Sequence, residues 1–258
     1  MTIGKRSLGG LITRVIDPLT WSALSRMVRL HISPLRVLVQ ELFSSGDYPQ
    51  IRTVRTPTGE CPVHLFHPED LSTLNLVFCR QDYLVPEELN LVVDIGANVG
   101  ISALFWLTRN RGCHVMAYEP VPTNVEKLKI NLAPFQERYT LGQVAVSDVR
   151  GKVEFGIEES GKLGGIGLET GRSIQVESVH IMDILDPLLS RHRVIDCLKV
   201  DTEGSEESIL KGIDSDCWKY IRSLNVEDYF GTTPQVVPDF FSWNRRGSAL
   251  RFINQKSG

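Results

Sequence analysis

The sequence predicts an α/β fold in which a mainly parallel β-sheet is covered by helices on both faces. Apolar runs of strand length alternate with helix-like runs from about residue 89 to residue 230. Such alternation favours right-handed crossovers between parallel neighbours. Four expected strands end in an acidic residue, namely Asp94, Glu119, Asp201 and Glu227. Because ligands of such sheets bind outside the carboxyl ends of the strands, these acids predict one shared rim.

The elements follow from hydrophobic spacing and from turn and capping residues. Strands are expected over 89–95, 113–119, 139–146, 174–179, 194–200 and 221–226, with a hairpin near 152–157. Helices are expected over 71–80, 98–109, 123–132, 183–189 and 205–211. Thr123 and Glu126 have the spacing of a capping box. Five glycines in residues 160–171 indicate a flexible loop, which either closes over a substrate or forms a plain surface hairpin.

The domain organisation is expected to comprise a helical extension over residues 1–50 and one larger domain over 51–258. The larger domain divides into a hairpin lead-in (51–88), a core (89–230) and a C-terminal segment (231–258). Residues 10–45 look helical, with breaks near Pro18 and Pro34. Residues 1–55 hold eight basic and three acidic residues, net +5, so the remainder carries −8. The helices either cover a sheet with arginines facing water, which we favour, or contact an acidic membrane or partner.

Composition excludes several classes of protein. A chain of 258 residues with 42% hydrophobic residues can bury a real core, and a net charge of −3 indicates no general affinity for nucleic acid. Five scattered cysteines without a C-x-x-C pair are typical of reduced core thiols in a cytoplasmic protein. No uncharged apolar run is long enough for a transmembrane helix. The oligomeric state is left open.

The segment Val92–Gly100, VVDIGANVG, forms a strand, a glycine-rich turn and a helix start. Dinucleotide sites share this outline, but there the helix N-terminus holds an anionic pyrophosphate, which Asp94 would repel. Asn98 also replaces the middle glycine of that motif. A ligand with an ammonium and a sulfonium suits the turn better, which points to S-adenosylmethionine (SAM). Asp94 would lie near its amino group, Gly96 and Gly100 under its methionine part, and Glu119 on its ribose hydroxyls.

A second cluster lies in Leu198–Glu206, LKVDTEGSE, at another strand-to-helix turn. Methyl transfer to oxygen requires a positioned acceptor and removal of its proton. Asp201 is the first candidate for the base and Glu203 the second, with Lys199 fixing their orientation. The same two acids are the candidate ligands if Mg²⁺ takes part. His180 and Glu227 are weaker base candidates, and Glu206 is equally well explained by the dipole of the following helix.

These segments resemble the FkbM-type SAM-dependent methyltransferases. The matching motifs are VVDIGANVG, AYEPVP at 117–122, Asn131-Leu132, VAVSD at 144–148 with Gly151, 179–185 around Asp183, and CLKVDTEGSEESILKG at 197–212, with Asp82-Tyr83 before the first strand. The resemblance implies a class I methyltransferase fold, with a seven-stranded, mostly parallel sheet and helices on both faces. It implies SAM as methyl donor and a hydroxyl acceptor, with Asp94, Gly96, Asn98, Glu119 and Pro120 at the cofactor and Ala145 near the adenine.

The family acts on sugar hydroxyls of glycans and glycolipids and on polyketide hydroxyls, so a sugar acceptor is the first expectation and a polyketide the alternative. Residues after Glu227 follow the family pattern only loosely, and this region often shapes the acceptor site. A nicotinamide-dependent oxidoreductase and a SAM-binding scaffold without turnover are the competing hypotheses.

Overall fold

The computed structural model describes residues 2–3, 6–7, 18–43, 45–86, 88–158, 164–168, 171–227 and 235–256. The chain divides into two compact units, Met1–Asp82 and Tyr83–Gly258. This division differs from the expected boundary at residue 50, because the hairpin that follows residue 50 contacts the preceding helices. Among the described residues, no helix is both long and apolar enough to cross a membrane.

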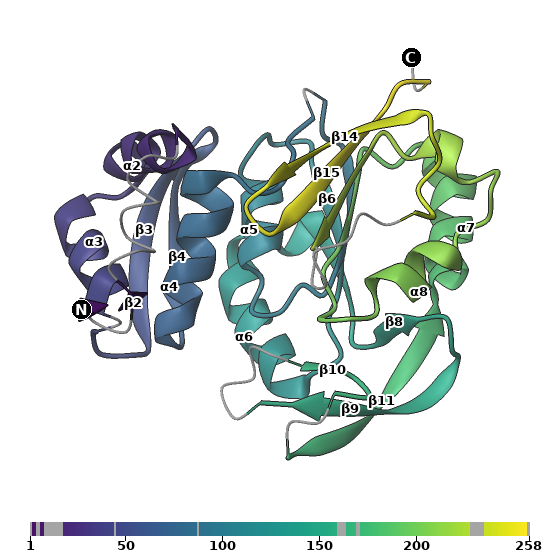
Figure 1. The fold of residues 1–258 in the computed structure, drawn as a ribbon, viewed down its shortest axis with the longest axis horizontal. Coiled ribbons are helices and arrows are strands. Elements are labelled where there is room, and N and C mark those ends of the chain that lie inside the picture. Colours follow the sequence, from purple (N-terminus) through teal and green to yellow (C-terminus); the bar gives the residue numbers. More distant parts are fainter. Residues whose placement is uncertain are drawn as a thin grey trace. The chain divides into compact units, whose positions relative to one another are not determined.

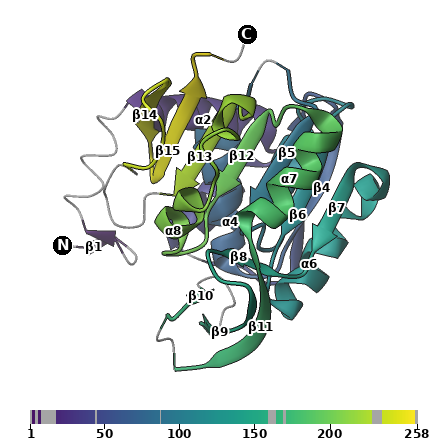
Figure 2. The same cartoon turned by 90° about the vertical axis from the view of Figure 1, so that its right-hand side faces the viewer.

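The second unit is built on a seven-stranded sheet of order β14-β15-β13-β12-β5-β6-β7, drawn in Figure 1 and labelled strand by strand in Figure 2. Neighbours from β13 to β7 are parallel, whereas β15 runs antiparallel to β13 and β14. The strands are β5 (Leu91–Ile95), β6 (His114–Tyr118), β7 (Tyr139–Gly142), β12 (Cys197–Val200), β13 (Ser223–Glu227), β14 (Phe241–Arg246) and β15 (Ala249–Asn254). The strand order reverses between β5 and β12, where ligands of such sheets bind. The expected class I fold is confirmed, and the C-terminal segment supplies its last two strands.

Helices cover both faces of this sheet: α5 and α6 lie on one side and α7 and α8 on the other (Figure 1). They span α5 (Ile101–Leu107), α6 (Pro122–Leu132), α7 (Ile181–His192) and α8 (Glu206–Lys211), with 3₁₀ turns η2 (Ala133–Arg138) and η3 (Trp218–Tyr220). Side chains alternate across each strand, so Leu198 and Val200 enter the apolar core with α7 and α8. The intervening Lys199 therefore points to the face of α5.

A separate four-stranded sheet of order β10-β9-β11-β8 lies beside the main sheet (Figure 2). It contains β8 (Ala145–Ser147), β9 (Gly151–Ile157), β10 (Gly164–Ile166) and β11 (Ser173–His180). The expected single strand over 139–146 is therefore wrong: the chain breaks after Gly142, and the halves join different sheets. The expected strand over 174–179 likewise joins this smaller sheet.

The expected loop over 160–171 is wrong in its middle, where Gly164–Ile166 forms β10 against β9. A side chain at Gly164 would meet the ring of Phe155, so glycine is selected here by close packing rather than by flexibility. Residues 159–163 and 169–170 lie outside the described residues.

The expected capping box at the start of α6 is also wrong. The helix begins at Pro122, and the side chain of its N-cap, Val121, accepts no capping hydrogen bond. Proline at the first helical position has its φ fixed near the helical value and lacks the N–H that would need a partner. The helix therefore starts one residue before Thr123.

Among its described residues, the first unit combines three α-helices and a π-helix with a β-hairpin. It contains β1 (Thr2–Ile3), β2 (Arg6–Ser7), α2 (Pro18–Leu30), α3 (Pro34–Phe43), β3 (Gln50–Thr56), β4 (Gly59–Leu65), α4 (Pro68–Leu74) and a π-helix η1 (Asn75–Arg80). Pro18 and Pro34 each open a helix, which confirms the expected break near Pro34, whereas the break near Pro18 stays a prediction. The expected helix over 71–80 is instead α4 continued as η1. Residues 8–17 lie outside the described part of the chain.

Candidate active site

The turn after β5 is shaped by three residues in the left-handed region: Gly96, Asn98 and Gly100, with φ of +77°, +48° and +86°. The backbone N–H groups of Gly96 and Ala97 both donate to the carbonyl oxygen of Tyr118 at 3.0 Å, which ties the turn to the end of β6. A Cβ atom at Gly96 would lie 1.8 Å from the carbonyl oxygen of Asp201. Glycine is therefore required because the turns after β5 and β12 touch there.

A row of polar side chains crosses the three central strands below these turns. Asp94 of β5 is the Cα partner of Lys199 in β12, and Lys199 is the Cα partner of Asn225 in β13. In-register neighbours on parallel strands present their side chains on the same face. Asp94, Lys199 and Asn225 are each at most 1% exposed. Charges this deep persist only when they are paired, so the row must satisfy itself.

Lys199 provides that pairing. Its Nζ lies 3.0 Å from Asp94 Oδ1 and 3.3 Å from Asp201 Oδ2, and it donates to the carbonyl oxygens of Ile95 and Gly96. Burial alone would lower the pKa of Lys199, but the carboxylates of Asp201 and Asp94 outweigh it and hold that pKa above its usual value. One ammonium thus holds both turns and two carboxylates together.

Asp94 does not present an unmatched charge to a ligand, as the sequence argument assumed. The Ser102 hydroxyl donates to Asp94 Oδ2 at 2.6 Å, Lys199 occupies Oδ1, and the side chain is fully buried. The buried Asp94 carboxylate supports the turn from inside the protein. The backbone of the turn, not this carboxylate, lies at the rim formed by the strand ends. Lys199, one strand away, neutralises this acid, and the spacing of residues in the sequence does not predict that ion pair.

Glu119 follows β6 and reaches back across the rim. Its carboxylate accepts from the backbone N–H groups of Asn98 at 2.9 Å and Val121 at 3.0 Å, and from the Asn124 side chain at 3.3 Å. Burial raises the pKa of Glu119 to about 7, and these hydrogen bonds oppose that rise. The side chain is 5% exposed. A carboxylate has room for about four hydrogen bonds, so Glu119 can still accept one from a ligand.

Ala145 and Pro120 are both buried next to this rim. Ala145, at the start of β8, packs in a cluster with Val121, two residues after Glu119. The structure therefore gathers the expected cofactor residues around the ends of β5 and β6.

Asp201, at the end of β12, is the centre of a second group. The Tyr83 hydroxyl donates to Asp201 Oδ2 at 3.0 Å, and Glu227 is also hydrogen-bonded to this carboxylate. The negative charge of Asp201, with burial, raises the pKa of Glu227 well above its usual range, so Glu227 holds a proton at neutral pH. Burial pushes the pKa of Asp201 up, but Lys199, Glu227 and Tyr83 together hold it below its usual value. Asp201 and Glu227 therefore titrate as a pair.

Tyr83 is a site residue that the residue-level argument did not identify. Tyr83 lies on the segment before β5. In this segment the backbone N–H of Leu84 donates to Asn225 Oδ1 at 2.7 Å. The Tyr83 ring stacks on Trp106, and Lys199 Nζ lies 5.7 Å from its centroid. The one sequence signal was the resemblance at Asp82-Tyr83, because no spacing links residue 83 to residue 201.

Two other candidates have structural roles. Glu206 accepts hydrogen bonds from the backbone N–H groups of Thr202 and Gly204 and from the Thr202 hydroxyl, so it closes the turn after β12. His180 accepts from the backbone N–H of Met182 and caps α7. Both side chains are engaged in holding backbone rather than facing a substrate.

Carboxylate oxygens of Asp201, Glu203 and Glu227 lie within 4.8 Å of one another, an arrangement of hard oxygen ligands that suits a divalent cation. The sequence predicted two candidate ligands, Asp201 and Glu203, and the structure adds Glu227 as a third. The glycine strand β10 borders this group, since a Cβ at Gly165 would lie 3.0 Å from the carbonyl oxygen of Glu203.

The comparisons agree with this arrangement. The family model described as the methyltransferase FkbM domain matches residues 94–245, more than half of the chain. The chain is 27% identical over 225 residues to 31-O-demethyl-FK506 methyltransferase FkbM of Streptomyces tacrolimicus, covering 72% of this chain and 86% of that protein. It is 29% identical over 182 residues to methyltransferase sdnD of Sordaria araneosa, covering 56% and 69%.

Among solved structures, the precorrin-6y C5,15-methyltransferase of Geobacter metallireducens aligns with a TM-score of 0.37 and 11% identity, covering 66% of this chain and 81% of that one. The matched region of the family model begins at Asp94 and includes Glu119, Lys199, Asp201 and Glu227. The chain is a methyltransferase and belongs to the FkbM methyltransferase domain family.

Proposed function

We propose that this protein is a SAM-dependent O-methyltransferase in which Asp201 accepts the proton of an alcohol. The observation that carries the proposal is the direct contact between the turn after β5 and the turn after β12. This contact places a glycine-rich cofactor turn beside a carboxylate at the point where the strand order reverses.

The residues at the rim fit SAM. Gly96, Asn98 and Gly100 hold the turn in the left-handed region, and we assign the backbone of this turn to the methionine part of SAM. We assign Glu119 to accept from one ribose hydroxyl, Ala145 and Pro120 to contact the adenine side, and Asp94 to hold the turn. When bound, SAM supplies a methyl group that is already activated on a positively charged sulfur.

The chain then has to orient the acceptor and remove one proton. Lys199, Tyr83 and protonated Glu227 hold Asp201 ionised and fixed in place. The same contacts weaken Asp201 as a base. A weak base is sufficient, because the hydroxyl proton becomes strongly acidic as its oxygen gains the methyl group. Positioning therefore matters more here than basicity, and Glu203 stays the second candidate.

A bound divalent cation at Asp201, Glu203 and Glu227 is the alternative way to activate the alcohol. It would lower the pKa of a coordinated hydroxyl, and it requires Glu227 to lose its proton. Removing divalent ions with a chelator and restoring Mg²⁺ separates the two mechanisms: only the cation mechanism loses activity that Mg²⁺ restores.

The acceptor is proposed to be a hydroxyl of a natural product. The support comes from relatives, since the Streptomyces protein at 27% identity is named for a demethylated FK506 substrate. A sugar hydroxyl of a glycan or glycolipid, which was the first expectation from the sequence, stays a prediction. A panel that contains both kinds of acceptor decides between them.

The central experiment is Asp201→Asn, assayed with labelled SAM and that panel. We expect turnover to fall by about a hundredfold or more, as is typical for loss of a general base. The affinity for S-adenosylhomocysteine, measured by calorimetry, should change by no more than a few-fold. Full turnover in this variant would overturn the role of Asp201. Saturable cofactor binding with no turnover in the wild type on any acceptor would favour a SAM-binding scaffold, and preference for NAD would favour the oxidoreductase.

A further inference from the structure

The helices α2 and α3 and the residues that link them turn a large apolar surface to solvent. Thirteen large hydrophobic residues are exposed among the described residues, and six of them lie between positions 21 and 43. These six, which we call the outer apolar face, are Trp21, Val28, Ile32, Leu35, Val39 and Phe43, and they are between 51% and 78% exposed. Single exposed hydrophobics are ordinary, but a concentration of this kind marks an interaction site.

The spacing places most of these side chains in two stripes. Trp21 and Val28 lie seven residues apart on one side of α2, and Leu35, Val39 and Phe43 recur every four residues on one side of α3. Ile32 lies between the two helices. The opposite sides carry buried residues, including Met27 on α2 and Val37 on α3. Each helix is therefore apolar on its inner side and again on its outer side. The favoured expectation was that arginines of these helices face water, and the outer side carries these apolar side chains as well.

The charge around the outer apolar face is positive. Arg29 and Arg36 are exposed within it, and Arg55 donates to the backbone carbonyl of Arg29. In the described ranges, none of these three arginines has a carboxylate oxygen within 4.0 Å. The one acid of residues 18–43, Glu41, accepts hydrogen bonds from Ser72 and Asn75.

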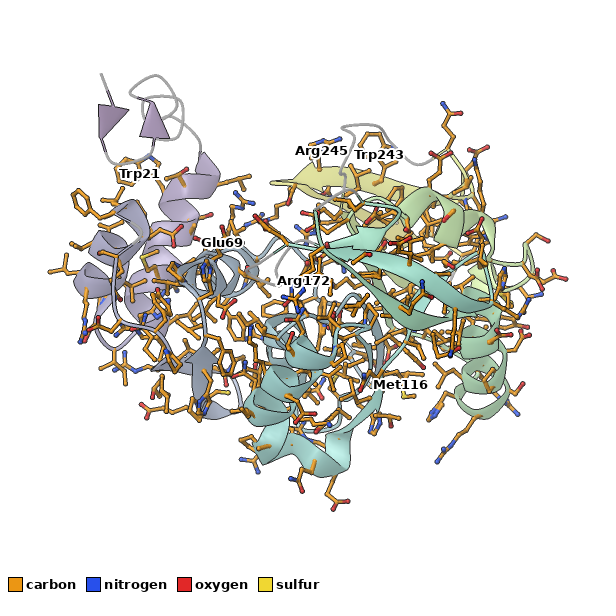
Figure 3. All side chains as sticks on the ribbon, turned by 90° about the horizontal axis from the view of Figure 1, so that it is seen from below. Trp21, Glu69, Met116, Arg172, Trp243 and Arg245 are labelled. Carbon is orange, nitrogen blue, oxygen red and sulfur yellow. The ribbon has the colours of Figure 1, made fainter. Side chains whose placement is uncertain are left out.

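We propose that the outer apolar face docks the protein on the surface of an anionic lipid bilayer. Helices that lie in a membrane interface combine large apolar side chains, an aromatic residue such as Trp21 (labelled in Figure 3) and flanking arginines. The apolar side chains enter the acyl boundary, while the arginines reach the anionic headgroups. A second copy of the chain is less suitable as the occupant, because it would bring two positive faces together.

The test is co-sedimentation of the full-length protein with vesicles of phosphatidylcholine alone or mixed with phosphatidylglycerol. We expect binding to the mixed vesicles only, weakened by added salt. The double variant Val28→Glu/Val39→Glu should bind the mixed vesicles at least about tenfold more weakly. The affinity of the variant Arg29→Gln/Arg36→Gln for the mixed vesicles should fall roughly tenfold or more, because each arginine removed weakens binding about fivefold.

The control is Ile130→Glu, which introduces, at an exposed apolar position of α6 in the other unit, the same single charge as either substitution of the double variant. It should bind vesicles as the wild type does, and circular dichroism should show all variants folded. Equal binding of wild type and the double variant, or equal loss in the control, overturns the proposal. Sedimentation equilibrium tests the other occupant: a dimer that Val39→Glu dissociates would assign the face to a second copy. The test requires no acceptor and no SAM, so its result is independent of the proposed function.

Discussion

Asp94 and Asp201 stand at the ends of adjacent parallel strands and share the ammonium of Lys199, yet the structure uses them differently. Asp94 lies one residue inside β5, fully buried, with Ser102 and Lys199 on its two oxygens. Asp201 lies one residue beyond β12, and its side chain keeps 22% of its surface exposed. A shift of one or two positions along a strand thus separates an acid that supports a turn from one that can meet a substrate.

The contact between the two turns is the most sensitive part of this comparison. Gly96→Ala forces a Cβ to within 1.8 Å of the Asp201 carbonyl oxygen, at a φ of +77°. We expect the free energy of unfolding to fall by more than about 3 kcal/mol and cofactor binding to be lost. Urea unfolding and calorimetry measure both. Gly167→Ala is the control, with a φ of +71° and no atom within 4 Å, and should cost only about 1 kcal/mol. Equal losses in the two variants would mean that strain, not contact, sets the requirement.

Removing the shared ammonium should affect both acids at once. Lys199→Met leaves two carboxylates without their counter-ion, and we expect a loss of about 3–5 kcal/mol in the free energy of unfolding. Since the pKa of Lys199 is raised on folding, its stabilising contribution is complete below its ordinary value of 10.5 and declines as pH rises further. The difference between the wild type and the variant should therefore shrink as pH rises above this value.

Lys152→Met, which removes an exposed lysine of β9, is the control for that variant and should stay within about 0.5 kcal/mol of the wild type. A Lys199 variant as stable as this control would show that the two carboxylates do not depend on the ammonium.

Cofactor affinity should depend on the ionisation of Glu119. Because its pKa is raised to about 7, Glu119 is largely protonated below that pH and a better hydrogen-bond acceptor above it. We expect S-adenosylhomocysteine to bind at least about fivefold more tightly well above this pH than well below it. The effect of Glu119 on folding has the opposite pH dependence. Its contribution to the free energy of unfolding is complete below pH 4.5 and declines as pH rises toward 7.

In Glu119→Gln the pH dependence of cofactor affinity should disappear, whereas Glu126→Gln, at an exposed position of α6, should keep it. A wild-type affinity that is flat across this pH range would exclude Glu119 as the ribose acceptor.

The smallest expected loss of stability concerns the positioning of Asp201. Tyr83→Phe removes one hydrogen-bond donor, so we expect kcat to fall about tenfold and the free energy of unfolding by about 1 kcal/mol. Loss of that donor raises the pKa of Asp201, so the acid side of the pH–rate profile should move to higher pH. Cofactor affinity should not change. Tyr220→Phe, at an exposed tyrosine, is the control, and a profile that does not move would reduce Tyr83 to a packing role.

Part of the site was predictable because it lies within short stretches of chain. The turn at Gly96–Gly100 and the acids at 119 and 201 each follow a recognisable strand, so local pattern was sufficient. Tyr83 and Asn225 were not predictable from residue patterns, because their hydrogen bonds join positions 118 and 141 residues apart in the sequence. The strand β10 was missed because its glycines resemble a loop until packing against Phe155 is known.

The sequence by itself determined the alternation of strands and helices, the glycine-rich turn and the placement of acids at strand ends, since these depend on neighbours a few residues apart. Only the tertiary structure decided how those acids are used. Strand register set Lys199 beside Asp94 and cancelled its charge, and chain folding brought Tyr83 and Glu227 onto Asp201. Ionisation and hydrogen bonding depend on distances between segments that are remote in the sequence, and those distances exist only after the sheet has assembled.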